Sequence, residues 1–210
     1  MIITVDGPSA AGKGTLARGL ATALGFAHLD TGLLYRAVAL KALTAGATET
    51  GDLEAIAEAL VPEDLRREGL RAEEISQAAS RVAALPEVRV ALLAFQRRFA
   101  DRPPGGEPGA VLDGRDIGTV VCPRADVKFF ITASPEARAR RRHKELIERG
   151  DRRIHARVQQ EMMLRDARDS GRAAAPLRPA EDAIVLDTTE MDADAVLETA
   201  IHMVASRRCA

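Results

Sequence analysis

Short runs of apolar residues alternate along the chain with longer segments in which apolar residues recur every three or four positions. The run IITV at 2–5 predicts a buried strand, and Leu16, Leu20 and Leu24 have the spacing of a helix that ends at Gly25. Further strands are predicted at 27–29, 110–113, 127–131 and 183–187, and a last helix at 192–208. About five strands separated by helices predict an α/β fold with a parallel sheet and right-handed crossovers.

Two helix starts are visible in the sequence. Thr31 is expected to be the N-cap of a helix with apolar residues over 33–40. Ser134 followed by Pro135 predicts an N-cap and the first residue of another helix.

Residues 47–109 interrupt the alternation of strands and helices. Three helical patterns follow one another there, and the segment ends in the linker-like stretch RPPGGEPG at 102–109. A polar, arginine-rich region covers 138–172. We therefore expect one domain over 1–210 that carries an inserted, mainly helical lobe at 47–109 and a lid region at 138–172.

Charge and cysteine content narrow the possible classes of protein. The formal net charge is −1, so the chain as a whole has no attraction to nucleic acid or to an anionic membrane surface. Cys122 and Cys209 are too few and too far apart for a metal site or a disulfide framework. No apolar run approaches the roughly 18 residues of a membrane span. We expect a cytoplasmic monomer with small-molecule substrates.

The segment GPSAAGKGT resembles a phosphate-binding loop, and it lies between a predicted strand and a predicted helix. Glycines let backbone N–H groups approach phosphate oxygens, and Lys13 adds a positive charge for the β- and γ-phosphates of ATP. The nucleotide-binding residues are expected to be Gly7, Pro8, Ser9, Ala10, Ala11, Gly12, Lys13, Gly14 and Thr15.

The hydroxyl of this loop comes one position late. Gly14 occupies the place of the usual Ser or Thr, and Thr15 follows it. Either Thr15 reaches Mg²⁺ by a different geometry, or nucleotide oxygens and water hold most of the metal. The Lys-Gly-Thr ending is more typical of small nucleotide kinases than of GTP switches, and no Asn-Lys-x-Asp run for guanine is present.

Four further stretches indicate which kinase this is. They are HLDTGLLYR (28–36), ISQAASRVAALPEVR (75–89), LDGRDIGTVV (112–121) and LRDARDSGRAAAPL (164–177). Together with DGPSAAGKGT they closely resemble bacterial cytidylate kinases over nearly the whole chain. The resemblance implies a P-loop kinase fold with a five-stranded parallel sheet, a monophosphate-binding lobe and a mobile lid. It also implies transfer of the ATP γ-phosphoryl group to CMP or dCMP, with Mg²⁺, in pyrimidine nucleotide metabolism.

The resemblance also implies an acceptor site assembled from distant parts of the chain. Arginine forks suit phosphate oxygens, and Arg115 lies just after a predicted strand, where α/β sheets bind ligands. By resemblance, the acceptor phosphate is contacted by Arg36, Arg115 and Arg172, the base by Ser80, Arg89 and Asp116, and the rest of the acceptor by Thr31, Arg165 and Asp169. The catalytic charges are expected to be Lys13, Arg115 and Arg172.

Several of these residues have simpler interpretations. Asp113 resembles the acidic residue that P-loop kinases direct at Mg²⁺ or at its water ligands, but a carboxylate there can also cap the following turn. Ser80 could be an ordinary hydroxyl on a helix surface. Arg165, Asp169 and Arg172 have the spacing of one helix face, so a plain surface ion pair is the alternative to substrate binding.

Other functions remain to be weighed. The basic stretch at 138–153 suggests RNA binding, but it lacks the aromatic residues that stack on bases, and acidic residues interrupt it. The triplet DTG at 30–32 occurs in aspartic proteases, which would leave the phosphate loop unexplained. A protein that binds ATP only to regulate a partner is the alternative to an enzyme.

The chain departs from the family pattern in one place. The bacterial enzymes also carry a small antiparallel sheet in the acceptor lobe. Between Leu60 and Ile75 this sequence has room for a short hairpin at most. The lobe is therefore expected to be smaller and mainly helical.

Overall fold

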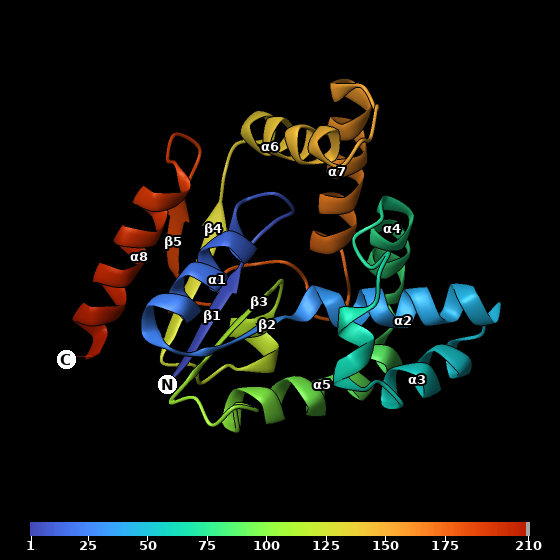
Figure 1. The fold of residues 1–210 in the computed structure, drawn as a ribbon, viewed down its shortest axis with the longest axis horizontal. Helices are drawn as coiled ribbons and strands as arrows, with labels where there is room; N and C mark the ends of the chain where they lie inside the picture. The colour runs from blue at the N-terminus through green and yellow to red at the C-terminus, as the bar shows by residue number, and fades with distance from the viewer. Residues whose placement is uncertain (209–210) are drawn as a thin grey trace.

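A computed structural model describes residues 1–208, and Figure 1 shows a central sheet with helices around it. The strands are β1 (Ile2–Asp6), β2 (Ala27–Asp30), β3 (Ala110–Gly114), β4 (Val127–Thr132) and β5 (Ile184–Asp187). All four pairings are parallel, and the order across the sheet is β2-β3-β1-β4-β5. The prediction of a five-stranded parallel sheet is confirmed.

The helices are bounded as follows. They are α1 (Lys13–Leu24), α2 (Thr31–Ala45), α3 (Thr50–Glu58), the 3₁₀ helix η1 (Pro62–Arg66), α4 (Glu73–Val82), α5 (Pro86–Asp101), the π-helical turn η2 (Ile117–Val121), α6 (Pro135–Glu148), α7 (His155–Ser170) and α8 (Ala193–Arg208). Ser134 accepts a hydrogen bond from the Ala137 amide at 3.2 Å, so the predicted cap of α6 is confirmed.

Each face of the sheet has its own hydrophobic core, because side chains alternate along a strand. Val111 of β3 packs in the cluster that α1 and α8 cover. Its neighbours Ala110 and Leu112 pack in the other cluster, with residues from α2, α4, α5 and η2. The segment 47–109 is thereby anchored on one face of the sheet.

The segment 47–109 contributes helices and no strand to the described structure. Pro62–Arg66 forms η1 where the sequence left room for a hairpin, and Asp64 within it is buried, 3% exposed. Lys41 donates a hydrogen bond to this carboxylate at 2.8 Å. This ion pair ties the short connection to α2.

Two local predictions are wrong. Thr31 is not an N-cap, because Asp30 occupies that position and Thr31 is the first residue of α2. The Thr31 hydroxyl instead donates to the backbone oxygen of Asp113 at 2.8 Å. Arg172 does not share a helix face with Arg165, because α7 ends at Ser170.

Two further findings concern features noted in the sequence. Within residues 1–208, no helix combines the length and the apolar character that crossing a membrane requires. Cys122 is a buried free thiol, and Cys209 lies outside the described residues.

Candidate active site

The loop after β1 has the backbone that phosphate binding requires. Gly7 has φ 145°, and a Cβ there would lie 2.0 Å from the carbonyl oxygen of Ile131. Only glycine fits this position, where the loop passes against β4. Gly12 is the N-cap of α1 and adopts φ 96°, so the helix N-terminus begins at the end of the loop. Amide groups and the positive end of the helix dipole are thus available to an anion.

Lys13 is held across this loop. Its ammonium group donates to the Pro8 carbonyl oxygen at 2.9 Å, and the residue is 7% exposed. Burial lowers the pKa of Lys13 to about 7, and the nearby Arg115 charge adds to the effect. A phosphate next to this amine would favour its charged form.

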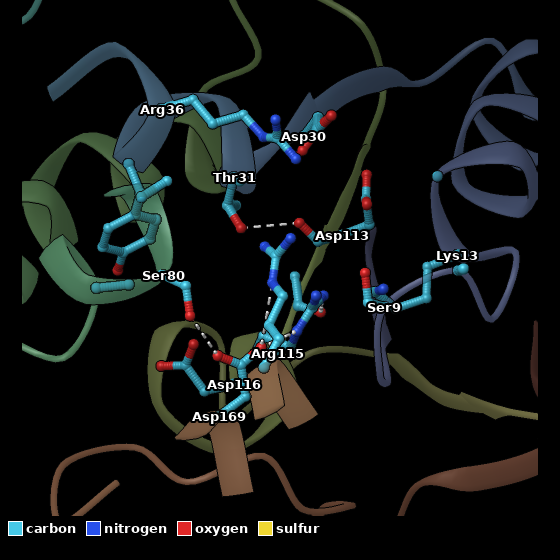
Figure 2. A pocket seen from close by; sticks show the side chains of 18 of the residues that line it. Ser9, Lys13, Asp30, Thr31, Arg36, Ser80, Asp113, Arg115, Asp116 and Asp169 are labelled. Atoms are coloured by element: carbon cyan, nitrogen blue, oxygen red, sulfur yellow. Dashed lines mark hydrogen bonds and ion pairs between the residues drawn. The ribbon is translucent and has the colours of Figure 1, made fainter. Parts of the chain in front are cut away.

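Three guanidinium groups surround one buried carboxylate, that of Asp169 (Figure 2). Asp169 is 1% exposed, and Arg115 donates to its Oδ2 at 3.0 Å. Arg172 pairs with its Oδ1, and Arg165 Nε lies 3.9 Å from its Oδ2. Burial alone would raise the pKa of Asp169, but the three arginines outweigh it and lower the pKa.

This cluster carries more positive charge than its single carboxylate balances. Arg165 Nε and Arg172 Nε are buried without a hydrogen-bond partner. Burial and the neighbouring Arg115 charge lower the pKa of Arg165 to about 10. Arg165 and Arg172 both line a cavity, and cationic side chains at a cavity are suited to a bound anion.

A second set of polar groups lies beside the arginine cluster. Arg89 pairs with Asp116, and its guanidinium lies 5.6 Å from the centre of the Tyr35 ring. The Ser80 hydroxyl donates to Asp169 Oδ1 at 3.2 Å and accepts from Arg168 at 3.0 Å. Ser80 and Asp116 are only 2% and 4% exposed, so protein groups rather than solvent determine the orientation of both side chains.

The carboxylate of Asp113 lies next to the phosphate loop. Its Oδ1 lies 2.8 Å from His28 Nε2 in the neighbouring strand β2. Its Oδ2 would be 3.7 Å from a Cβ built on Gly14. The side chain therefore has one oxygen held by His28 and the other turned towards the start of α1.

These groups line one cavity of about 290 Å³ between the phosphate loop and α4 and α7. Figure 2 shows Lys13 and Ser9 on one side and Ser80, Arg115 and Asp169 on the other. All nine residues assigned to the acceptor by resemblance line it, as do Asp113 and most of the phosphate loop. Gly7, Pro8 and Ala11 do not line this cavity. Gly7 and Pro8 contribute to the backbone shape of the loop, and Ala11 lines a second cavity.

Arg36 lies at the edge of this arrangement rather than in the cluster around Asp169. It donates to the Leu70 carbonyl oxygen at 3.0 Å, and Arg71 pairs with Asp30 at 3.1 Å beside it. In the present structure the Arg36 charge is thus engaged by the lobe.

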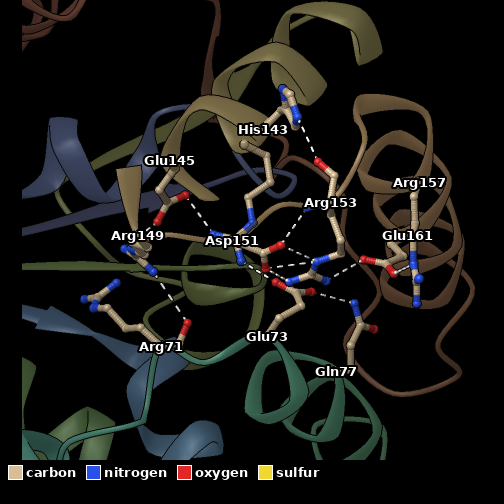
Figure 3. A network of polar contacts seen from close by, with 11 residues as sticks. Arg71, Glu73, Gln77, His143, Glu145, Arg149, Asp151, Arg153, Arg157 and Glu161 are labelled. Atoms are coloured by element: carbon tan, nitrogen blue, oxygen red, sulfur yellow. Dashed lines mark hydrogen bonds and ion pairs between the residues drawn. The ribbon is translucent and has the colours of Figure 1, made fainter. Parts of the chain in front are cut away.

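Helices α6 and α7 carry a network of charges that reaches the 47–109 segment (Figure 3). Arg142 of α6 pairs with Glu73 of α4 and with Glu145, at 2.7 Å in the second case. Arg153 pairs with Asp151 and with Glu161 of α7. Arg142 and Arg153 are therefore both held by carboxylates. Arg142 also lines the main cavity.

Sequence reasoning missed several residues that the fold brings to the site. His28 contacts Asp113, Arg168 contacts Ser80, and Arg142 lines the cavity. Asp6 accepts hydrogen bonds from the turn after Asp116. A histidine in a strand and arginines in an arginine-rich helix carry no distinctive local signal. Asp6 was visible as a polar residue between a buried strand and the loop.

Comparisons with known proteins identify the family of the chain. The model of the cytidylate kinase family matches residues 3–206. A cytidylate kinase of Paramagnetospirillum magneticum is 57% identical over 209 residues, covering 99% of each chain. One of Rhodospirillum rubrum is 54% identical over 209 residues, covering 99% of this chain and 98% of its own.

Solved structures resemble the chain in fold alone. An uncharacterized protein from Eubacterium ventriosum has a TM-score of 0.56 at 14% identity, covering 98% of both chains. A sugar kinase from Janibacter sp. has a TM-score of 0.50 at 17% identity, covering 97% of this chain and 94% of its own. The strand–loop–helix at residues 2–24, the arginine cluster and the full-length relatives lead to one conclusion: the chain belongs to the cytidylate kinase family.

Proposed function

We propose that this protein transfers the γ-phosphoryl group of ATP to CMP or dCMP, giving ADP and CDP or dCDP. The observation that carries the proposal is the single cavity that has Lys13 on one side and the arginines around Asp169 on the other. A phosphoryl group passing between two nucleotides needs positive charge on both sides of it.

The donor would bind with its phosphates on the loop at 7–15. A second cavity of about 420 Å³ continues from Ala10 and Gly12 towards α8 and is lined by Arg141, Thr188 and Val196 among others. Arg141 donates to the Thr188 hydroxyl at 3.0 Å, which fixes its side chain there. This cavity adjoins the loop, so we assign it to the adenosine of ATP.

Mg²⁺ fits this site as a companion of the nucleotide. No group of three or more His, Cys, Asp or Glu side chains able to hold a metal occurs within the described part of the chain. Mg²⁺ is commonly held by one or two carboxylates, substrate phosphates and water. The free Oδ2 of Asp113 and the exposed hydroxyl of Thr15 are the residues that would hold it, directly or through water.

The acceptor phosphate is its own nucleophile, so no general base is required. Arg115 and Arg172 would hold the phosphate near the donor, and the Arg36 guanidinium would reach it from the lobe. Lys13 would stabilise the charge on the transferring group. Closure of 138–172 over the cavity would exclude water, which otherwise competes as acceptor.

The base would meet Asp116, Arg89 and Ser80. The Ser80 hydroxyl donates its proton to Asp169, and one of its two lone pairs accepts from Arg168. Its second lone pair remains, so towards a ligand Ser80 can only accept a hydrogen bond. Asp116 is likewise an acceptor. Two acceptors favour the amino group of cytosine over the carbonyl oxygen of uracil.

We further propose that the enzyme acts as a cytoplasmic monomer without a nucleic-acid partner. The site described above is complete within one chain. Arginines of the basic region also form ion pairs with carboxylates, which reduces the charge available for a nucleic-acid backbone.

The decisive experiment is a coupled assay of ADP release. ATP and Mg²⁺ are supplied with CMP, dCMP, AMP, GMP, UMP or shikimate in turn. We expect turnover with CMP and dCMP well above that with the others. ATP binding without turnover of any acceptor would contradict the proposal and favour a regulatory ATP-binding protein.

A further inference from the structure

The Asp6 carboxylate forms a bridge between β1 and the turn that follows β3. Its Oδ1 accepts from the Ile117 amide at 2.9 Å, and its Oδ2 accepts from the Gly118 amide at 2.7 Å. Asp6 is the last residue of β1 and is 4% exposed. Both oxygens are thus used by two successive amides more than one hundred positions away.

The buried Asp6 carboxylate destabilises the folded state. Among the described residues, no lysine or arginine forms an ion pair with Asp6. Burial raises its pKa to about 7 although the two amides oppose the shift. A buried carboxylate without a cation destabilises a protein. An effect other than stability is therefore the better explanation for its presence.

The two amides begin η2, and Asp116 is the residue just before it. The first amides of a helical turn have no partner within the turn, so an outside acceptor decides where the turn lies. A Cβ on Gly118 would be 3.0 Å from Thr4 Oγ1 and 3.4 Å from Asp6 Oδ2, so the turn is pressed against β1.

Fixing the Ile117 amide fixes the peptide plane that it shares with Asp116. The Asp116 side chain is restrained separately, by its ion pair with Arg89. Asp6 itself does not line the main cavity. It therefore has no contact with a ligand there, and any effect on the acceptor must pass through the turn.

We propose that Asp6 is a positioning residue for acceptor selection, because its carboxylate holds the turn that aims Asp116 at the base. This inference rests on the proposed function. Asp6 also precedes Gly7, the first residue of the phosphate loop. The same side chain therefore ties the acceptor-selecting turn to the strand that carries the donor site.

The test is Asp6→Asn, with kcat and KM measured for CMP and UMP. Asparagine has the same shape, but its NH₂ group faces one of the two amides and leaves it unpaired. We expect kcat/KM for CMP to fall and the preference over UMP to narrow, each by about 5- to 150-fold, the range for a mismatched buried polar pair. The dissociation constant of ATP should change by less than about threefold, because the Asp6 carboxylate bonds the Ile117 and Gly118 amides and no group of the phosphate loop.

A double-mutant cycle with Asp116→Asn separates positioning from a general loss of structure. If Asp6 acts through Asp116, the double variant loses no more preference than Asp116→Asn alone. If the double variant instead loses CMP preference by the product of the two single-variant losses, the proposal is overturned. Gly118→Ala provides a second variant should Asp6→Asn not fold, because its Cβ would crowd Thr4 Oγ1 and Asp6 Oδ2 where the turn meets β1. It should narrow the preference in the same direction.

Asp64→Asn is the matched control. Asp64 is also buried and accepts from an amide, that of Val61 at 3.2 Å, but it does not line the main cavity. We expect it to lower the Tm and leave the CMP preference unchanged. The proposal is wrong if Asp6→Asn behaves like this control. A wild-type enzyme that uses CMP supports the proposed function whatever the variants do, and one that does not would remove both proposals.

Discussion

The proposed function gives the charge of Lys13 the most direct role in the reaction. Its amine is buried and held by the Pro8 carbonyl, ready to exchange that contact for a phosphate oxygen. Lys13→Ala should lower kcat by about 10²-fold or more, as for the loss of a main electrostatic donor. Kinetics at saturating ATP and CMP, with circular dichroism to verify folding, test this. A folded variant with normal kcat would contradict the assignment.

Thr15 tests how the metal is held. Its hydroxyl is exposed at the start of α1, while Asp113 presents a free oxygen near Gly14. If nucleotide oxygens and water hold most of the metal, Thr15→Val should slow turnover and leave the Mg²⁺ dependence similar. A large rise in the Mg²⁺ concentration needed for half-maximal rate would instead identify Thr15 as a direct ligand.

Asp116 tests how the base is chosen. It is buried and paired with Arg89, so its carboxylate accepts but cannot donate. Asp116→Asn supplies an NH₂ group, which suits the uracil carbonyl. The ratio of kcat/KM for CMP and UMP should narrow by about 5- to 150-fold. An equal fall for both acceptors would reassign base selection, first to Ser80 and Arg89.

At the scale of elements, the packing of α6 against α4 depends on charge. Arg142 and Glu73 join the two helices through side chains that are 13% and 17% exposed. The stretch between α6 and α7 carries Arg149, Arg152 and Arg153, all targets of trypsin. The freedom of this stretch can therefore be read from its rate of cleavage.

Glu73→Gln should speed tryptic cleavage of the nucleotide-free enzyme in this stretch by about two- to fivefold, the effect of losing an ion pair worth about 0.5–1 kcal/mol. Mass spectrometry of the early fragments gives the rate. Glu148→Gln is the control, because Glu148 forms a long ion pair with the exposed Lys144, at 4.0 Å. Equal rates in the two variants would show that the Arg142–Glu73 pair does not restrain α6.

At the scale of the whole molecule, Asp6 links folding to pH. Burial raises its pKa to about 7, Asp116 adds to the rise, and the two amides and Lys13 oppose it. The folded protein therefore takes up a proton at higher pH than the unfolded chain. This group makes folding more favourable as the pH falls from about 8 to about 5.

Urea unfolding of the wild type and Asp6→Asn at several pH values isolates this effect, because other groups titrate alike in both. The wild type should gain free energy of unfolding relative to the variant as the pH falls over that range. A difference that does not change with pH would show that the carboxylate keeps its ordinary pKa in the fold.

The sequence by itself determined most of the elements and the glycine-rich loop at 7–15. Apolar periodicity located the five strands and most helices, because burial of one face repeats every two or every 3.6 residues. It did not locate α7, which lies in the polar, arginine-rich region at 138–172. Local chemistry marked the phosphate loop, the Ser134 cap and the glycine at the end of α1. It misplaced the start of α2 by one residue, because Asp30 and Thr31 are both good capping residues.

Only the tertiary structure decided which residues meet around Asp169, Asp113 and Asp116. Asp169 accepts hydrogen bonds from Ser80, Arg115 and Arg172. His28 contacts Asp113, and Asp6 accepts a hydrogen bond from the turn after Asp116. Most of these contacts join residues more than fifty positions apart. They depend on the strand order β2-β3-β1-β4-β5 and its parallel register, which bring the carboxyl ends of β1, β2 and β3 to one edge. A periodic pattern specifies which face of an element is buried, but not which distant element will cover it.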